Sequence, residues 1–341
     1  MASETTAGYL AERIDALREH IVSLAGAVPS LPEEFARVGE QIAQESAVRG
    51  HGVLLALNVL LLVTGFALEG VYRWYVKEKS GERLRAAGLR FARDAGALAA
   101  FTLGSVAALL VFEWPVGTRN ALIAFFVAFI ALRAAIVVSR ALLSPADARL
   151  RLVPVDDAAA RFWHRRIALF AGWLAFGWMI VERLGAHGMS PAPRMLVAYV
   201  LGLGLLAIAI EAFWRRSRAS AVLFVALWAL WVLKAIGFFW LLLVAFALLP
   251  LLRLAQRSAD HVLDGVPAAV IGRGLRALII IAAAIVLVRA FGLNVDSMAS
   301  DSSVWMRLAR GAVHALAIVL VADLLWLVAA SLIDRKLGSV P

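Results

Sequence analysis

The sequence predicts an all-α, polytopic membrane protein, and two observations carry this prediction. Hydrophobic residues make up 62% of the 341 residues and charged residues only 17%, a balance that excludes an ordinary soluble domain. Several stretches also approach the ~20 apolar residues that an α-helix needs to cross ~30 Å of hydrocarbon. We therefore expect about nine transmembrane helices, arranged as hairpins, at 53–73, 94–112, 119–140, 166–183, 195–214, 219–236, 238–254, 269–289 and 306–333.

The distribution of lysine and arginine between these spans predicts their orientation. Connections on one side of the membrane carry 22 of these residues, and connections on the other side carry 7. Positively charged loops stay in the cytoplasm, whereas translocated loops are depleted in positive charge. We therefore expect a multi-pass membrane protein with its N-terminus outside the cytoplasm and a cytoplasmic C-terminus.

The apolar run from Ala219 to Leu254 tests this orientation, because a single helix of that length would measure over ~50 Å. Such a helix is far longer than a bilayer is thick. We expect two helices with a tight turn at Lys234-Ala235-Ile236-Gly237, which keeps the arginine-rich segment 253–276 on the cytoplasmic side.

Three regions follow from this pattern. Residues 1–50 form an extracytoplasmic head, residues 51–268 hold the first seven spans, and residues 269–341 hold the last two. In the head, an amphipathic helix is expected over 7–25, and a second helix starts at Ser30 with a Glu33 capping box. The head is acidic, and residues 1–20 lack the basic and apolar regions of a signal peptide. Because the head is expected outside the cytoplasm, we expect that a cleaved leader preceded Met1.

Composition excludes several classes of function. The net charge of +10 resides in short loops at one membrane face, so anionic lipids are the expected partner and nucleic acid is not. The chain has no cysteine, and its six histidines show no metal-ligand spacing. No phosphate-binding loop, nucleophile elbow or paired carboxylates are present. The sequence therefore predicts neither an enzyme nor a cofactor or metal site.

Ionisable residues inside a span are candidate functional residues, because burying their charge in hydrocarbon is costly. The candidates are Arg133, Glu211 and Asp323. Arg133 is expected to extend toward the surface near Arg140, and Glu211 to pair with Arg215, as Glu69 pairs with Arg73 one helical turn away. Asp323 has no such partner. It has two interpretations, a hydrogen bond to a neighbouring helix or a role in proton or ion movement.

Aromatic and basic residues meet at two cytoplasmic span ends. The segment Phe162-Trp163-His164-Arg165-Arg166 is weakly similar to Phe213-Trp214-Arg215-Arg216. Trp and Arg are typical anchors at the membrane interface, and every span end lies at that interface. The similarity can therefore arise without an internal repeat. The expected lipid-contacting residues are Trp163, Arg165, Arg166, Trp214, Arg215, Arg216 and Arg218.

The C-terminal part resembles a known family. It contains Arg273-Gly-Leu-Arg276, a hairpin turn at Phe291-Gly292-Leu293-Asn294-Val295 and a last span ending Leu332-Ile333-Asp334-Arg335-Lys336. In this respect it is similar to the segment before the pore domain in large MscS-family mechanosensitive channels. The whole chain resembles the N-terminal sensor half of the moderate-conductance, paddle-bearing members. The family's glycine- and alanine-rich pore helix and β-rich vestibule are absent from this sequence.

The resemblance implies a tension-sensing region of a homo-oligomer, a heptamer, with the hairpins as peripheral paddles among lipids and the pore in a further C-terminal portion. It implies protection against hypoosmotic shock, a location in the bacterial inner membrane and a periplasmic N-terminus. A second interpretation remains open: a small-molecule or lipid-linked transporter, or an envelope-assembly membrane protein, complete at 341 residues.

Overall fold

Ten α-helices and one short 3-10 helix make up the described part of the chain. This computed structural model describes residues 6–47, 51–76, 83–111, 114, 116–214, 217–262 and 266–290. Within these residues there is no strand, so the predicted all-helical class is confirmed. Six of the described helices are long and apolar enough to cross a membrane, as expected of a polytopic helical membrane protein. The expected span 306–333 lies outside the described residues.

The chain divides into two compact units. Unit 1 comprises residues 1–151 and 155–234, and unit 2 comprises residues 152–154 and 235–341. The helices of unit 1 are α1 (Thr6–Ala27), α2 (Leu31–Ala47), α3 (His51–Tyr75), α4 (Arg83–Val111), α5 (Val116–Leu143), α6 (Asp157–Ala186), α7 (Pro191–Phe213) and α8 (Arg218–Val232), with the 3-10 helix η1 at Ala148–Leu150. Unit 2 holds α9 (Ile236–Val262) and α10 (Val266–Ala290).

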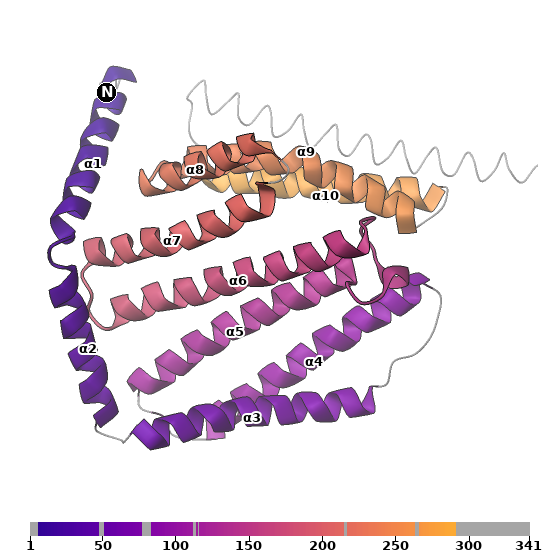
Figure 1. The fold of residues 1–341 in the computed structure, drawn as a ribbon, viewed down its shortest axis with the longest axis horizontal. Coiled ribbons are helices and arrows are strands. Elements are labelled where there is room, and N and C mark those ends of the chain that lie inside the picture. The colour runs from indigo at the N-terminus through magenta and orange to yellow at the C-terminus, as the bar shows by residue number, and fades with distance from the viewer. Residues whose placement is uncertain are drawn as a thin grey trace, which may run out of the picture. The chain divides into compact units, whose positions relative to one another are not determined.

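Helices α3 to α8 form a row in unit 1, in which each helix packs chiefly against the helices before and after it in the chain (Figure 1). Helices α1 and α2 run across one end of this row, and we call it the head end. The connection between α6 and α7 lies there. The opposite end, where α5 connects to α6 and α7 to α8, is the basic end.

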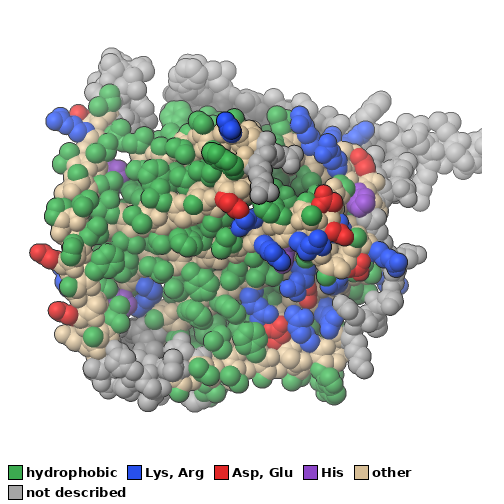
Figure 2. Space-filling model, viewed as in Figure 1, with side chains coloured by type: hydrophobic (Ala, Val, Ile, Leu, Met, Phe, Trp, Pro, Cys, Tyr) green, Lys and Arg blue, Asp and Glu red, His purple; other side chains and the backbone are tan. Residues whose placement is uncertain are grey.

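Lysine and arginine side chains gather at the basic end, over the ends of α4, α5 and α6, whereas apolar side chains cover the middle of the row (Figure 2). An apolar band next to a basic rim is the pattern that a bilayer and its headgroups impose on a helical membrane protein. The end that is rich in positive charge is therefore opposite to the end that carries α1 and α2.

The tightest packing in the row joins α3 to α4. A Cβ atom added at Gly104 would lie 2.8 Å from the backbone oxygen of Thr64, and one at Gly65 would lie 2.7 Å from the Phe101 ring. Both glycines thus allow the two backbones to approach closely, as small residues do between membrane helices. Leu61 and Phe101, which are fully buried, fill the core beside this contact.

The connection between α5 and α6 is shorter than expected and well packed. The sequence predicts a loop over 141–165, but α6 begins at Asp157, where the Asp156 carboxylate caps the helix by accepting from the Ala159 N–H at 2.6 Å. The buried Arg151 side chain organises the remaining loop. Its Nε donates to the Leu143 carbonyl at 2.9 Å, and its guanidinium also binds the Val155 carbonyl and Asp157.

The apolar run 219–254 is divided into two helices, as predicted. Helix α8 ends at Val232 and α9 begins at Ile236, with Lys234 between them at a φ of 54°. Helix α8 has 15 residues, which gives ~22 Å, less than the ~30 Å of a hydrocarbon core. In unit 2, α9 and α10 pack along each other, with Gly272 against Ala259 and Gln256.

Two helices form in residues 6–47, as predicted for the N-terminal segment, but the expected capping box is wrong. Ser30 Oγ donates to the Ala27 carbonyl at 3.0 Å instead of capping α2. Glu33 is exposed, and the next residue, Glu34, is buried. The reason is tertiary: the Glu34 side chain contacts α7, a contact that the local sequence spacing does not reveal.

Candidate functional site

The most unusual polar contact in unit 1 joins Arg133 on α5 to Glu69 on α3. The two terminal guanidinium nitrogens, Nη1 and Nη2, donate to the two carboxylate oxygens of Glu69 at 2.7 and 2.8 Å. The side chains are only 20% and 8% exposed, respectively. A bidentate arginine–carboxylate pair is among the stronger hydrogen-bonded ion pairs, and low exposure reduces its screening by water.

The pair belongs to a chain of alternating charges across three helices. Arg73 Nε donates to Glu69 at 3.0 Å, which confirms the predicted same-helix pair. Arg73 and Arg140 then each lie 3.5 Å from a carboxylate oxygen of Asp94 on α4. This network of Glu69, Arg73, Asp94, Arg133 and Arg140 ties α3, α4 and α5 together, and no sequence pattern predicts the role of Asp94.

Aromatic rings surround the Arg133 guanidinium. Its carbon Cζ lies 4.9 Å from the centre of the Phe101 ring, 5.4 Å from that of Phe66 and 5.8 Å from that of Phe129. Ring faces attract cations, and the attraction grows where water is excluded. Arg133 therefore does not extend to the surface near Arg140, as the sequence suggests, because Glu69 and three rings hold it within the row.

The described residues of the two aromatic and basic segments of the sequence lie side by side at the basic end. Trp163 on α6 contacts Phe213 on α7, with ring centres 5.2 Å apart. Arg166 donates to Glu211, so Glu211 pairs with a neighbouring helix. The expected partner of Glu211, Arg215, lies outside the described residues. Helices α6 and α7 are antiparallel, so the start of α6 lies beside the end of α7. This explains why Trp163 and Phe213 are in contact.

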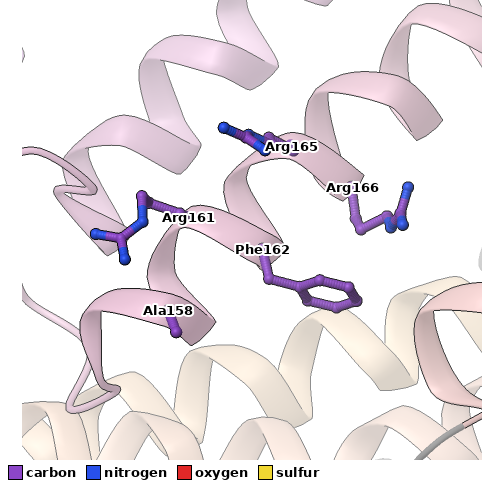
Figure 3. A pocket seen from close by; sticks show the side chains of 5 residues that line it. All are labelled: Ala158, Arg161, Phe162, Arg165 and Arg166. Atoms are coloured by element: carbon purple, nitrogen blue, oxygen red, sulfur yellow. The ribbon is translucent and has the colours of Figure 1, made fainter.

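A shallow depression of about 370 Å³ lies on the first turns of α6. Ala158, Arg161, Phe162, Arg165 and Arg166 line it, and Arg161 and Arg166 extend to opposite sides in Figure 3. Arg165 and Arg218 are exposed, as is Trp214. Exposed guanidinium groups beside interfacial tryptophans can bind phosphate groups of lipids.

Sequence reasoning missed two contacts that hold α1 and α2 on the head end. Glu34 accepts from the Ser190 hydroxyl at 2.7 Å and from the Ser190 N–H at 3.3 Å, where α7 begins. His20 Nε2 lies 3.1 Å from the Val232 carbonyl oxygen and 3.2 Å from the Tyr199 hydroxyl. The one available signal was a polar residue, His20, within the apolar side of an amphipathic helix.

The ionisable groups of these contacts have shifted pKa values. Hydrogen bonds from Arg37 and then from Ser190 hold the pKa of Glu34 below its ordinary value. Burial, followed by the nearby Lys234 ammonium, lowers the pKa of His20. Glu34 is therefore stabilised as a carboxylate and His20 as a neutral imidazole.

Asp323, Arg215 and Arg216 lie outside the described residues, so their predicted roles stay predictions. Comparisons with protein-family models, with curated proteins and with solved structures found no match to this chain.

Proposed function

We propose that the chain is the tension-sensing membrane region of a mechanosensitive ion channel that protects bacteria against hypoosmotic shock. The proposal includes nine spans, a periplasmic N-terminus and a cytoplasmic C-terminus in the inner membrane. It also includes a ring of subunits, a heptamer by the family resemblance, with the helix hairpins of residues 51–268 as peripheral paddles among lipids. Tension favours whichever channel state has the larger area in the membrane plane, because that state gains the most free energy when the bilayer is stretched.

The observation that best supports this proposal is the single row of helices. On α6, exposed apolar side chains point in two opposite directions: Leu169 and Ile180 lie about 200° around the helix from Ile167 and Trp178. A row one helix thick offers much apolar surface to lipid. A transporter instead encloses its substrate between helices, near the bilayer midplane.

The arrangement of charge is also compatible with a sensor. The Arg133–Glu69 pair and its aromatic surroundings join α3 to α5 within the apolar part of the row. Force from lipids on one of these helices then reaches the others through strong contacts. At the basic end, Arg165 and Arg218 are available to anionic headgroups, each interaction contributing about 1 kcal/mol near such a surface.

Patch clamp of the full-length gene product tests the proposed function. Expressed in cells that lack their own mechanosensitive channels, it should give a current that opens with suction and should raise survival after hypoosmotic shock. Absence of a tension-gated current together with solute uptake by proteoliposomes would favour the transporter.

Lipid binding at the basic end has a separate test. Replacing Arg165 and Arg218 with Gln should reduce the amount of anionic lipid that copurifies with the protein. Arg119→Gln provides the control, because this exposed arginine lies near the head end. Equal lipid content in all three proteins would contradict a role for Arg165 and Arg218.

A further inference from the structure

Helices α1 and α2 connect helices that are far apart in the row. Helix α1 packs against α7, whereas α2 contacts α3, the next helix in the chain (Figure 1). The row begins with α3, and α7 is its fifth helix. The two head helices thus span most of the width of the row at one end.

The first attachment is at the N-terminus of α7. Glu34 accepts two hydrogen bonds from Ser190, whose own side chain does not cap the helix. A carboxylate at this position satisfies a backbone N–H that the helix leaves without a partner and interacts favourably with the helix dipole. Val38, four residues after Glu34, and Met189, the residue before Ser190, are only 3% and 4% exposed.

The second attachment is at the C-terminus of α8. Val232 is the last residue of α8, and its carbonyl is one of those that a helix end leaves without a backbone donor. His20 lies within hydrogen-bond distance of this carbonyl and of the Tyr199 hydroxyl, and its ring meets the Tyr199 ring edge-on. Leu24, Ala27 and Tyr199 are all buried.

The connection from α7 to α3 is short. Helix α7 lies four places after α3 in the row, but α5 also contacts α3 directly through Arg133 and Glu69, so the separation of α3 and α7 is less than the ~32 to 40 Å of four full helix steps. From Glu34 to the end of α2 is 13 residues, or about 20 Å. The four residue steps from Ala47 to His51 reach at most about 14 Å. The total reach of about 34 Å is therefore an upper limit on the distance between Glu34 and the start of α3 as long as α2 stays helical.

We propose that α1 and α2 form a strap that limits how far the helix row can widen in the membrane plane, with the Glu34–Ser190 and His20–Val232 contacts as its latch. When the row widens beyond this reach, the latch must open or helix α2 must unwind. The link to gating rests on the proposed tension-sensing function, whereas the limit on width is a property of the row itself.

Distance measurement tests the strap directly. Spin labels at Val63→Cys and Leu203→Cys report the separation of α3 and α7, because both sites are exposed and each lies 12 residues from the start of its helix. The absence of native cysteines makes this labelling specific. Lysophosphatidylcholine, added to one leaflet of vesicles that contain the full-length protein, mimics tension.

We expect the label separation to increase more in the His20→Ala/Glu34→Ala variant than in the otherwise unchanged labelled protein. The additional shift should exceed half of the ~8–10 Å helix spacing. Glu33→Ala is the matched control, since it removes an exposed carboxylate from the same turn, and it should behave as the parent protein. Equal shifts in all three proteins would overturn the strap.

A second arm compares a single protein with and without a crosslink, so that effects of its substitutions on folding are the same in both states. In a Glu34→Cys/Ser190→Cys protein without labels, a short reductant-cleavable thiol crosslinker should raise the tension threshold in patch clamp, and reductant should restore it. An unchanged threshold after complete crosslinking would remove the strap from gating. If the parent protein passes no tension-gated current, the proposed function fails, and the distance measurement still decides whether the strap exists.

Discussion

Glu69 and Arg133 illustrate how a charge can be accommodated in an apolar helix row. Arg133 donates twice to Glu69, and Arg73 donates to the same carboxylate. Each charge is desolvated, and each has a partner in place of the lost water. Such a pair contributes little compared with an apolar replacement of the same shape, but leaving one member alone is costly.

This difference gives the first prediction. Arg133→Leu leaves Glu69 with only Arg73, so it should destabilise the protein by roughly 3 to 5 kcal/mol. The Glu69→Leu/Arg133→Leu double variant should recover much of that loss. Unfolding in mixed detergent micelles measures both. A double variant that is less stable than Arg133→Leu would contradict the view that the unpaired charge causes the cost.

The attachment of α1 and α2 should weaken in acid. The pKa of His20 is lowered by burial and by Lys234, with Tyr199 as the other titratable group in contact. The folded state therefore binds fewer protons than the unfolded state below the ordinary His pKa of 6.5, and the attachment loses free energy as pH falls below that value. The lowered pKa of Glu34, beside Arg37, adds a loss of the same sign as pH falls below 4.5.

Hydrogen exchange at the amides of α1 checks this prediction. Protection should decrease as the pH falls below the ordinary His pKa of 6.5, after correction for the intrinsic rate of exchange. His20→Gln cannot take up a proton and should remove most of this pH dependence. A pH dependence that persists in His20→Gln would assign it to other groups.

At the scale of elements, the close approach of α3 and α4 depends on Gly104. An added Cβ would meet the Thr64 backbone oxygen at 2.8 Å, and a backbone atom cannot move aside as a flexible side chain can. Gly104→Ala should therefore separate the helices and destabilise the protein by about 1 to 3 kcal/mol. Thermal unfolding in detergent gives the measurement.

Gly88 on the same helix is the matched control. Nothing lies within 4 Å of a Cβ added there, so Gly88→Ala should be neutral or stabilise the helix by up to about 1 kcal/mol. Equal destabilisation by both substitutions would contradict a role for the contact with Thr64, because helix propensity favours alanine over glycine at both positions.

The predictability of elements and of sites differs for a physical reason. Helices, and the division of the run 219–254 at Lys234, could be predicted because chain length and apolar composition determine them locally. The partners of Arg133 and Glu34 could not, because they lie 64 and 156 residues away in the sequence. Same-helix spacing does predict the Glu69–Arg73 pair. It misses a partner on a neighbouring helix, as it did for Glu211.

At the scale of the whole molecule, the positive charge that the sequence assigns to one side of the membrane lies at one end of unit 1 in the structure. The 22-to-7 distribution of lysine and arginine predicts which connections stay in the cytoplasm. In unit 1 the basic side chains gather at the end opposite to α1 and α2 (Figure 2). The acidic N-terminal segment is therefore expected in the periplasm and the connection between α5 and α6 in the cytoplasm.

Single cysteines test this topology, since the chain has none of its own. Glu40 on α2 and Ala146 in the α5–α6 connection are both exposed, so differences in burial within the protein do not bias the comparison. In intact cells with a permeable outer membrane, an impermeant thiol reagent should label Glu40→Cys but not Ala146→Cys. After the inner membrane is lysed, both should be labelled, because only the bilayer protects Ala146. Ser217→Cys, at the α7–α8 connection, should behave like Ala146→Cys. Labelling of Ser217→Cys before lysis would place the two connections on opposite sides and would require a different number of crossings between them.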